Sequence, residues 1–157
     1  MKLIIHLTLL IMNTTIMTGV TTDSITTYLT EEGFQPKQFS GGNILFRYQF
    51  GVYVVAIDEN DPQFLQIIMP KIFDMESSNY TKALIAANTL CASKKIVKAI
   101  VSKDSVDINT EILVDSTSNF SELIPRMLGM LQEARYDFYH LINESPERYR
   151  LNIVHHD

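Results

Sequence analysis

The chain has 157 residues, a formal net charge of −5 and a hydrophobic fraction of 46%. That length suits one domain with a substantial core, and the composition is typical of a folded protein rather than a disordered one. The acidic balance argues against a nucleic-acid binder, because phosphate contacts need a concentrated positive surface. We therefore expect one folded domain without a nucleic-acid partner.

The first twenty residues, 1–20, stand apart because they contain an apolar run over 3–12. This run is too short to cross a bilayer, which takes about 20 apolar residues. It resembles a secretory signal with a weak cleavage candidate near Gly19. The other interpretation, which we favour, is that the biological start is Met12 or Met17 and that the domain is cytoplasmic. The domain itself is expected over 22–143, followed by a polar tail over 144–157.

The first predicted helix covers about 22–32. Thr22 or Asp23 can cap its free N–H groups, and Gly33 suits the position just past its end. Three strands should follow, with the sequences NILFRYQF, VYVVAIDE and FLQIIMPKIF. The turns between them are short, so an antiparallel meander is the natural arrangement.

In the second and third of these strands, residues of both parities are largely apolar, which a sheet covered on one side would not need. We hypothesise that one face packs on helices while the other meets a partner subunit or client. The alternative is that the long last helix covers the second face within one chain. The candidate interaction surface consists of Tyr53, Val55, Ile57, Leu65, Ile67 and Met69.

A second helix of about four turns is predicted after Ser78, with its apolar positions at helical spacing: Tyr80, Ala83, Leu84, Ala87, Leu90 and Cys91. Cys91 is the only cysteine, so an intrachain disulfide is excluded, and we expect it to be buried as a small hydrophobe. The segments KIVKAIVSK and VDINTEILVD should then form a hairpin.

The last helix has the longest apolar stripe, running from Phe120 to Ile142. Ser118 is a plausible cap, and Pro125 predicts a bend or a later start because proline lacks the amide hydrogen that a helix interior needs. The resulting fold class is α+β. An antiparallel sheet of about five strands is expected, in the order helix, three strands, helix, two strands, helix.

No catalytic constellation is visible in the sequence. The four histidines, His6, His140, His155 and His156, lack the spacing of a metal site. The acidic cluster in the DENDP loop lacks the alternation of a calcium loop. We expect no enzyme activity, no metal and no cofactor.

Three segments carry a family resemblance: YLTEEGF (28–34), the stretch from Gly41 to Pro70, and the stretch 83–115 with its Ala-Ala-Asn-Xaa-Leu core at Ala86 to Leu90. With the final helix, they resemble the bacterial sensory transduction regulators of YbjN type, whose members share the fold of type III secretion chaperones. The resemblance covers about 22–143. It implies a cytoplasmic, non-enzymatic domain that binds another polypeptide, in a chaperone-like or regulatory role and often as a homodimer. A different class of function, a secreted or periplasmic ligand-binding domain, is suggested by the apolar start.

Overall fold

The computed structural model describes residues 19–115 and 117–143, so the predictions for the apolar start and for the tail lie almost entirely outside the described residues. The helices are α1 (Thr22–Glu31), α2 (Tyr80–Ser93) and α3 (Phe120–Asn143). The strands are β1 (Lys37–Gln38), β2 (Ile44–Tyr48), β3 (Gly51–Ala56), β4 (Phe64–Asp74), β5 (Val97–Val101) and β6 (Ser105–Leu113). Two short 3-10 turns, η1 (Ser40–Gly42) and η2 (Ser77–Asn79), precede β2 and α2. The predicted α+β class is confirmed.

The sheet has six antiparallel strands in the order β1-β2-β3-β4-β6-β5. The predicted meander of β2, β3 and β4 and the predicted β5–β6 hairpin are both present. The sixth strand, which the sequence did not reveal, is the two-residue β1, where Lys37 pairs with Leu45 and Gln38 with Ile44. Such a short strand has no alternation to detect, because pairing with β2 alone defines it.

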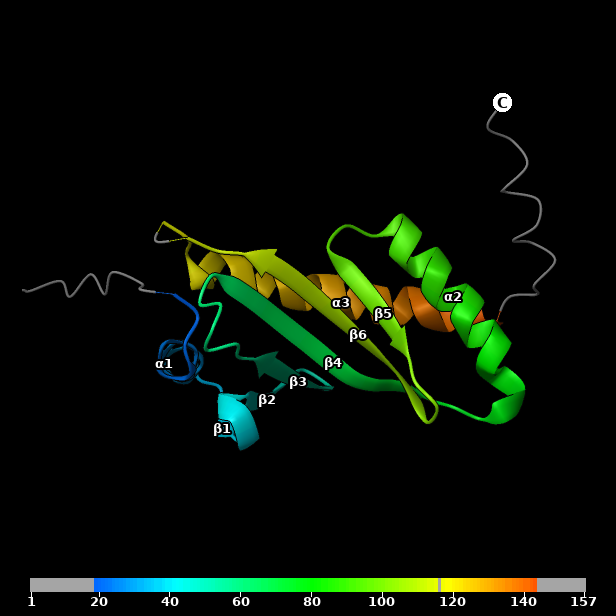
Figure 1. Ribbon diagram of the computed structural model, residues 1–157, viewed down its shortest axis with the longest axis horizontal. Helices are drawn as coiled ribbons and strands as arrows, with labels where there is room; N and C mark the ends of the chain where they lie inside the picture. Colours follow the sequence, from blue (N-terminus) through cyan, green and yellow to red (C-terminus); the bar gives the residue numbers. More distant parts are fainter. Residues whose placement is uncertain (1–18, 116, 144–157) are drawn as a thin grey trace, which may run out of the picture.

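All three helices lie toward one face of the sheet or at its ends. In Figure 1, α3 crosses behind β4, β6 and β5, while α1 lies at the β2 end and α2 lies beside β5. We call the side against α3 the inner face and the opposite side the outer face. The inner face and the helices enclose the core, whose largest fully buried side chains include Tyr53, Phe46, Phe138, Ile25, Leu29, Ile67 and Ile108.

The ends of α1 are fixed by local hydrogen bonds. Thr21 is the N-cap, rather than the predicted Thr22 or Asp23, because its Oγ1 accepts the N–H of Ser24 at 3.1 Å. Ser24 reciprocates, since its Oγ accepts the N–H of Thr21 at 3.0 Å. Gly33 adopts a φ of +85° just past the helix, as its predicted position requires.

The buried stripe of α2 is rotated from the predicted one. Leu84 is 43% exposed and Cys91 is exposed, so the prediction that both face the core is wrong. The small side chains face inward instead, which lets the helix pack closely against α3 and β5; the buried residues are Ala83, Ala86, Ala87 and Leu90. At the end of α2, Lys94 forms ion pairs with Glu133 at 2.6 Å and Asp137 at 2.5 Å on α3.

Helix α3 begins at Phe120 and continues through Pro125, so of the two alternatives predicted for this proline, a bend or a later start, the later start is wrong. Asn119 caps the start, because its Oδ1 accepts the N–H of Ser121 at 3.0 Å. The predicted cap, Ser118, instead accepts the N–H of Asp115 at 2.9 Å in the preceding turn. The apolar stripe along α3 is buried as expected.

Candidate protein-binding surface

The residues predicted to form an interaction surface lie on the inner face. Tyr53, Val55, Leu65 and Ile67 are fully buried and Met69 is 4% exposed, while Ile57 is half-buried and packs against the same core. They therefore belong to the interior of this chain and not to its surface. Both faces of β3 and β4 are largely apolar, as predicted. The residues predicted to form the free surface, however, lie on the face that is buried, and the alternate residues lie on the other face.

The register of the β2–β3 hairpin explains the error. Tyr48 pairs with Gly51, so the turn is centred on Gln49 and Phe50, and Phe46 then lies opposite Tyr53. Directly paired residues of antiparallel strands point to the same face, which places Tyr53 with the buried Phe46. Gln49 adopts a φ of +49° in this turn without being glycine. A turn centred on two non-glycine residues lacks the usual sequence signal.

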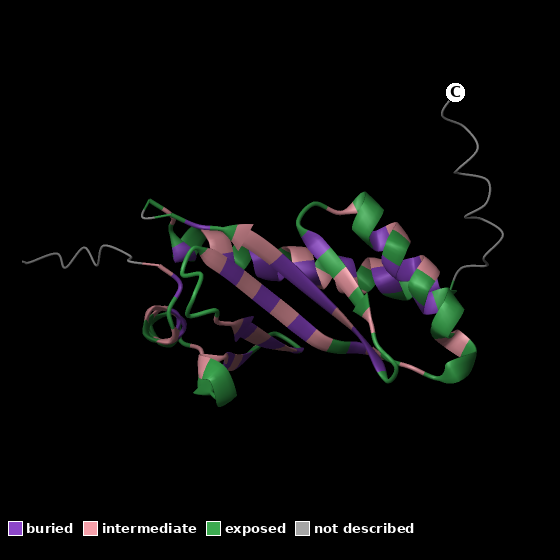
Figure 2. Ribbon diagram, viewed as in Figure 1, coloured by how far each residue is buried: buried purple, intermediate pink, exposed green. Residues whose placement is uncertain are grey.

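The outer face carries the other apolar parity and has no described helix over it (Figure 1). Figure 2 shows the consequence along β4, where buried residues alternate with partly exposed ones. We call its apolar residues the outer-face patch, and they come from five strands: Leu45, Val52, Val54, Ala56, Phe64, Ile68, Ile100 and Leu113. Two of them are strongly exposed, Ile100 at 50% and Leu113 at 78%.

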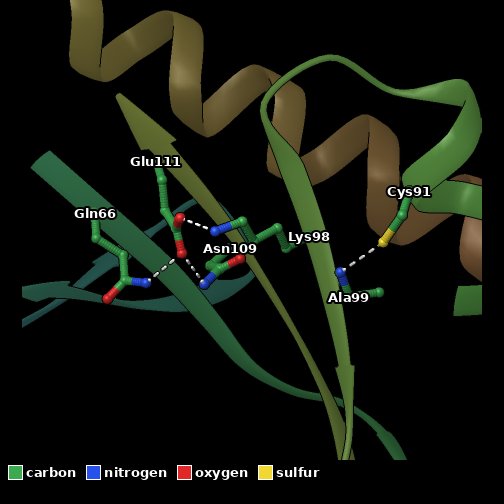
Figure 3. Close-up of polar contacts among 6 residues, drawn as sticks. All are labelled: Gln66, Cys91, Lys98, Ala99, Asn109 and Glu111. Atoms are coloured by element: carbon green, nitrogen blue, oxygen red, sulfur yellow. Dashed lines mark hydrogen bonds and ion pairs between the residues drawn. The ribbon is translucent and has the colours of Figure 1, made fainter. Parts of the chain in front are cut away.

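A polar cluster interrupts this patch near the β4–β6–β5 side. One carboxylate oxygen of Glu111 accepts hydrogen bonds from Gln66 Nε2 at 2.8 Å and from Asn109 Nδ2 at 3.0 Å, and the other oxygen pairs with Lys98 (Figure 3). The cluster therefore neutralises its own charge. Asn109 is only 2% exposed, and its Oδ1 has no hydrogen-bond partner among the described residues.

Both edges of the sheet are protected, so a partner is not expected to bind by adding a strand to the sheet. On the β5 edge, the backbone N–H of Ala99 donates to Cys91 Sγ at 3.2 Å, so α2 occupies the position that an added strand would take (Figure 3). The opposite edge is the two-residue β1, both of whose residues are exposed. Helix cover and short, charged edge strands are common ways of blocking edge pairing.

Among the described residues, the side chains that could bind a metal ion do not come together. In the described ranges, no three His, Cys, Asp or Glu side chains are grouped so that they could hold a metal ion. His140 is exposed and stacks edge-on against Tyr136 at 4.3 Å, while the other histidines lie outside the described residues. In the DENDP loop, Asp58 accepts the N–H of Asn60 at 2.9 Å, as in an ordinary polar turn. Across 19–115 and 117–143, no helix is long and apolar enough to be a membrane span.

Several solved structures match this arrangement, and two of them are described below, although no family model and no curated protein matches the sequence. An uncharacterized protein from Methanothermobacter thermautotrophicus has a TM-score of 0.59 at 14% identity, covering 83% of this chain and 99% of its own. YbjN from E. coli, a proposed transcription regulator, has a TM-score of 0.54 at 10% identity, covering 81% of this chain and 92% of its own. At these identities the matches establish the architecture. The chain therefore has a YbjN-like fold, as the sequence resemblance implied.

Proposed function

We propose that this chain is a cytoplasmic, non-enzymatic protein-binding domain, chaperone-like or regulatory in role, that uses the outer-face patch and forms a homodimer. The observation that supports the proposal is the uncovered outer-face patch, which spans several neighbouring strands. Contiguous exposed apolar area on a soluble protein commonly marks an interaction site. Covering it yields about 25 cal/mol per Å² of apolar surface removed from water.

A second copy of the chain suits this patch because its charges balance. Two-fold symmetry brings each patch against an identical patch, so a strongly one-signed surface would repel itself. Here Arg47 and Lys98 lie on the same face as Asp107 and Glu111. Two such sheets can stack about 10 Å apart, as in a sandwich whose inner faces interdigitate.

The side chains of the outer face also form a ridge on which another surface could pack. Leu45, Val54 and Ile68 follow one another across β2, β3 and β4 in a single cross-strand row. Branched side chains in such rows form ridges that fit between those of a facing sheet. A polypeptide client with apolar residues would use the same ridges, so dimer formation and client binding would compete.

The test measures mass by light scattering between about 1 and 200 µM, for the natural chain and for Ile68→Asp. We expect the natural chain to approach twice its mass of 17.9 kDa and Ile68→Asp to remain a monomer with an unchanged circular dichroism spectrum. Thr27→Asp, on the exposed side of α1, is the matched control and should dimerise like the natural chain. A natural chain that stays monomeric throughout would refute the homodimer.

A further inference from the structure

A small recess of about 120 Å³ opens between the β2–β3 turn and the middle of α3. It is lined by Gln49, Phe50, Gly51, Tyr53, Gln132 and Arg135, with Met69 behind them. These residues come from segments far apart in the sequence, which only the fold brings together. The recess lies at the tip of a hairpin, whereas the outer-face patch lies on the exposed side of the sheet.

Arg135 brings a positive charge to this recess. It is half-buried, and no carboxylate of the described residues forms an ion pair with it. Its guanidinium lies over the ring of Tyr139, with Cζ 5.8 Å from the ring centroid. Its helical neighbours at three and four residues' distance are Leu131, Gln132, Phe138 and Tyr139, so α3 supplies no acid to it. The acids on α3 nearby, Glu133 and Asp137, pair with Lys94 instead.

Tyr53 brings an unused hydroxyl to the same place. Its side chain is fully buried, and its hydroxyl has no hydrogen-bond partner among the described residues. A buried polar group without a partner destabilises the fold, so its presence calls for an explanation. Burial raises the pKa of Tyr53 against the opposing effects of Gln132 and Arg135, both of which lie near the hydroxyl; the hydroxyl therefore stays protonated, and it makes no hydrogen bond of standard geometry to a described residue.

Gly51 allows the side chains of Tyr53 and Met69 to pack directly against the backbone at the start of β3. A Cβ at Gly51 would lie 3.0 Å from the Tyr53 hydroxyl, 2.7 Å from its ring and 2.8 Å from Met69 Cε. The φ of Gly51 is not positive, so it is space rather than backbone conformation that calls for glycine here.

Two glutamines define the polar side of the recess. Gln132 Nε2 donates to Gln49 Oε1 at 2.6 Å, which ties α3 to the hairpin turn. Phe50, at the tip of the turn, is fully exposed and offers an apolar surface next to the recess. The recess thus combines a cation, a hydroxyl donor and two amides with an adjacent aromatic ring. This combination suits a ligand that has a negatively charged group attached to an apolar one.

We propose that this recess binds a carboxylate, with Arg135 forming the ion pair, the Tyr53 hydroxyl donating a hydrogen bond, and Phe50 contacting the attached apolar group. An arginine suits carboxylate geometry because its planar fork can donate two parallel hydrogen bonds. The volume admits a carboxylate with a few further atoms and excludes a nucleotide. The ligand is therefore either a free small carboxylate or the C-terminal carboxylate of a peptide.

The test is an amide NMR titration of the full chain with acetate, and with neutral acetamide as the matched ligand, at constant ionic strength. Acetate should shift the signals of Gly51 and Gln132 saturably, and acetamide should not. Arg135→Gln should weaken acetate binding at least tenfold. Arg126→Gln, an exposed arginine of the same helix, should leave it unchanged. Equal shifts with both ligands, or unchanged binding in Arg135→Gln, would overturn the proposal.

Tyr53→Phe separates a binding role from a structural one. Removing an unpaired buried hydroxyl should raise the melting temperature while weakening acetate binding three- to tenfold. A variant that is no more stable and binds acetate normally would contradict the assignment of this hydroxyl. A short peptide with a free C-terminus, compared with its C-terminal amide, then distinguishes the two ligand sources: tighter binding of the free-acid peptide than of acetate identifies a peptide terminus. Light scattering on the same samples reports the oligomeric state separately, so the two proposals can fail independently.

Discussion

The two faces of the sheet can be compared at adjacent residues by the substitutions Val55→Ala and Val54→Ala. Val55 lies on the inner face and is fully buried between Ile44 and Ile67, whereas Val54 is half-buried on the outer face between Leu45 and Ile68. The two valines are consecutive in β3, so the change in intrinsic strand preference is the same for both. The difference in stability between the variants therefore reports how well each face is covered.

The expected magnitudes follow from burial. Val55→Ala removes two buried carbon groups, worth about 1.6 kcal/mol of transfer free energy at ~0.8 kcal/mol each. A cavity of roughly 50 Å³ adds about 1.2 kcal/mol at ~24 cal/mol per Å³, giving about 3 kcal/mol in all. Val54→Ala leaves no enclosed cavity and loses about half of the transfer free energy, or ~0.8 kcal/mol. The gap of about 2 kcal/mol corresponds to roughly 4–8 °C in melting temperature for a domain of this size.

Urea unfolding followed by circular dichroism at about 1 µM measures both free energies of unfolding, and equal slopes would show that the same surface is exposed in each variant. If the outer face is covered by a second copy, the cost of Val54→Ala should increase at high protein concentration. The reasoning fails if Val54→Ala is as costly as Val55→Ala at low concentration, where the chain is monomeric. That result would mean that the chain covers its own outer face.

Three further outcomes are expected. Leu128→Asp should prevent folding, because Leu128 is 2% exposed and an unpaired buried charge costs several kcal/mol, whereas Leu84→Asp at a 43% exposed site should still give a folded circular dichroism spectrum. Lys94→Met should destabilise the chain by about 0.5–1 kcal/mol near neutral pH through loss of its pairing with Asp137 and Glu133. Hydrogen bonds from Lys94 to Asp137 and Glu133 raise the pKa of Lys94 above its ordinary value of 10.5. The stabilisation is therefore complete below pH 10.5 and is lost as the pH rises through the folded-state pKa. Urea unfolding from pH 7 to 11.5 should show the free energies of unfolding of the natural chain and of Lys94→Met converging at high pH. Cys91 should react with a thiol reagent in the folded protein, and protection from the reagent would contradict its exposure.

Much of the architecture could be predicted from the sequence because its signals are local. The stripe of α3 extends over many turns, and such long periodicity is hard to mistake. The hairpin of β5 and β6 and the positive φ of Gly33 likewise follow from patterns within a few residues. The match of α1 to its predicted span has the same origin.

The features that were missed depend on contacts between distant residues. In α2, the period was correct, but alanines can be buried as easily as leucines when another helix comes close, so the stripe could not be oriented from side-chain size. The contact that decides the orientation is with α3, more than thirty residues away. If the turn is placed at Gln49 and Phe50, Tyr48 pairs with Gly51 and Phe46 pairs with Tyr53. That register would have assigned Tyr53 to the inner face.

Glu111 on the outer face and Arg135 in the recess differ in whether their charges are paired. This difference bears on what each site can bind. On the outer face, Glu111 is already neutralised by Lys98 and hydrogen-bonded by Gln66 and Asn109, so a protein surface can cover it without leaving a buried charge unpaired. In the recess, Arg135 has no such partner in the described part of the chain, so covering it with an apolar surface would be unfavourable. The part of the outer face around Glu111 is thus suited to association driven by apolar contact. The recess is suited to a ligand that brings its own negative charge, and a partner that places a carboxylate there would gain specificity as well as affinity.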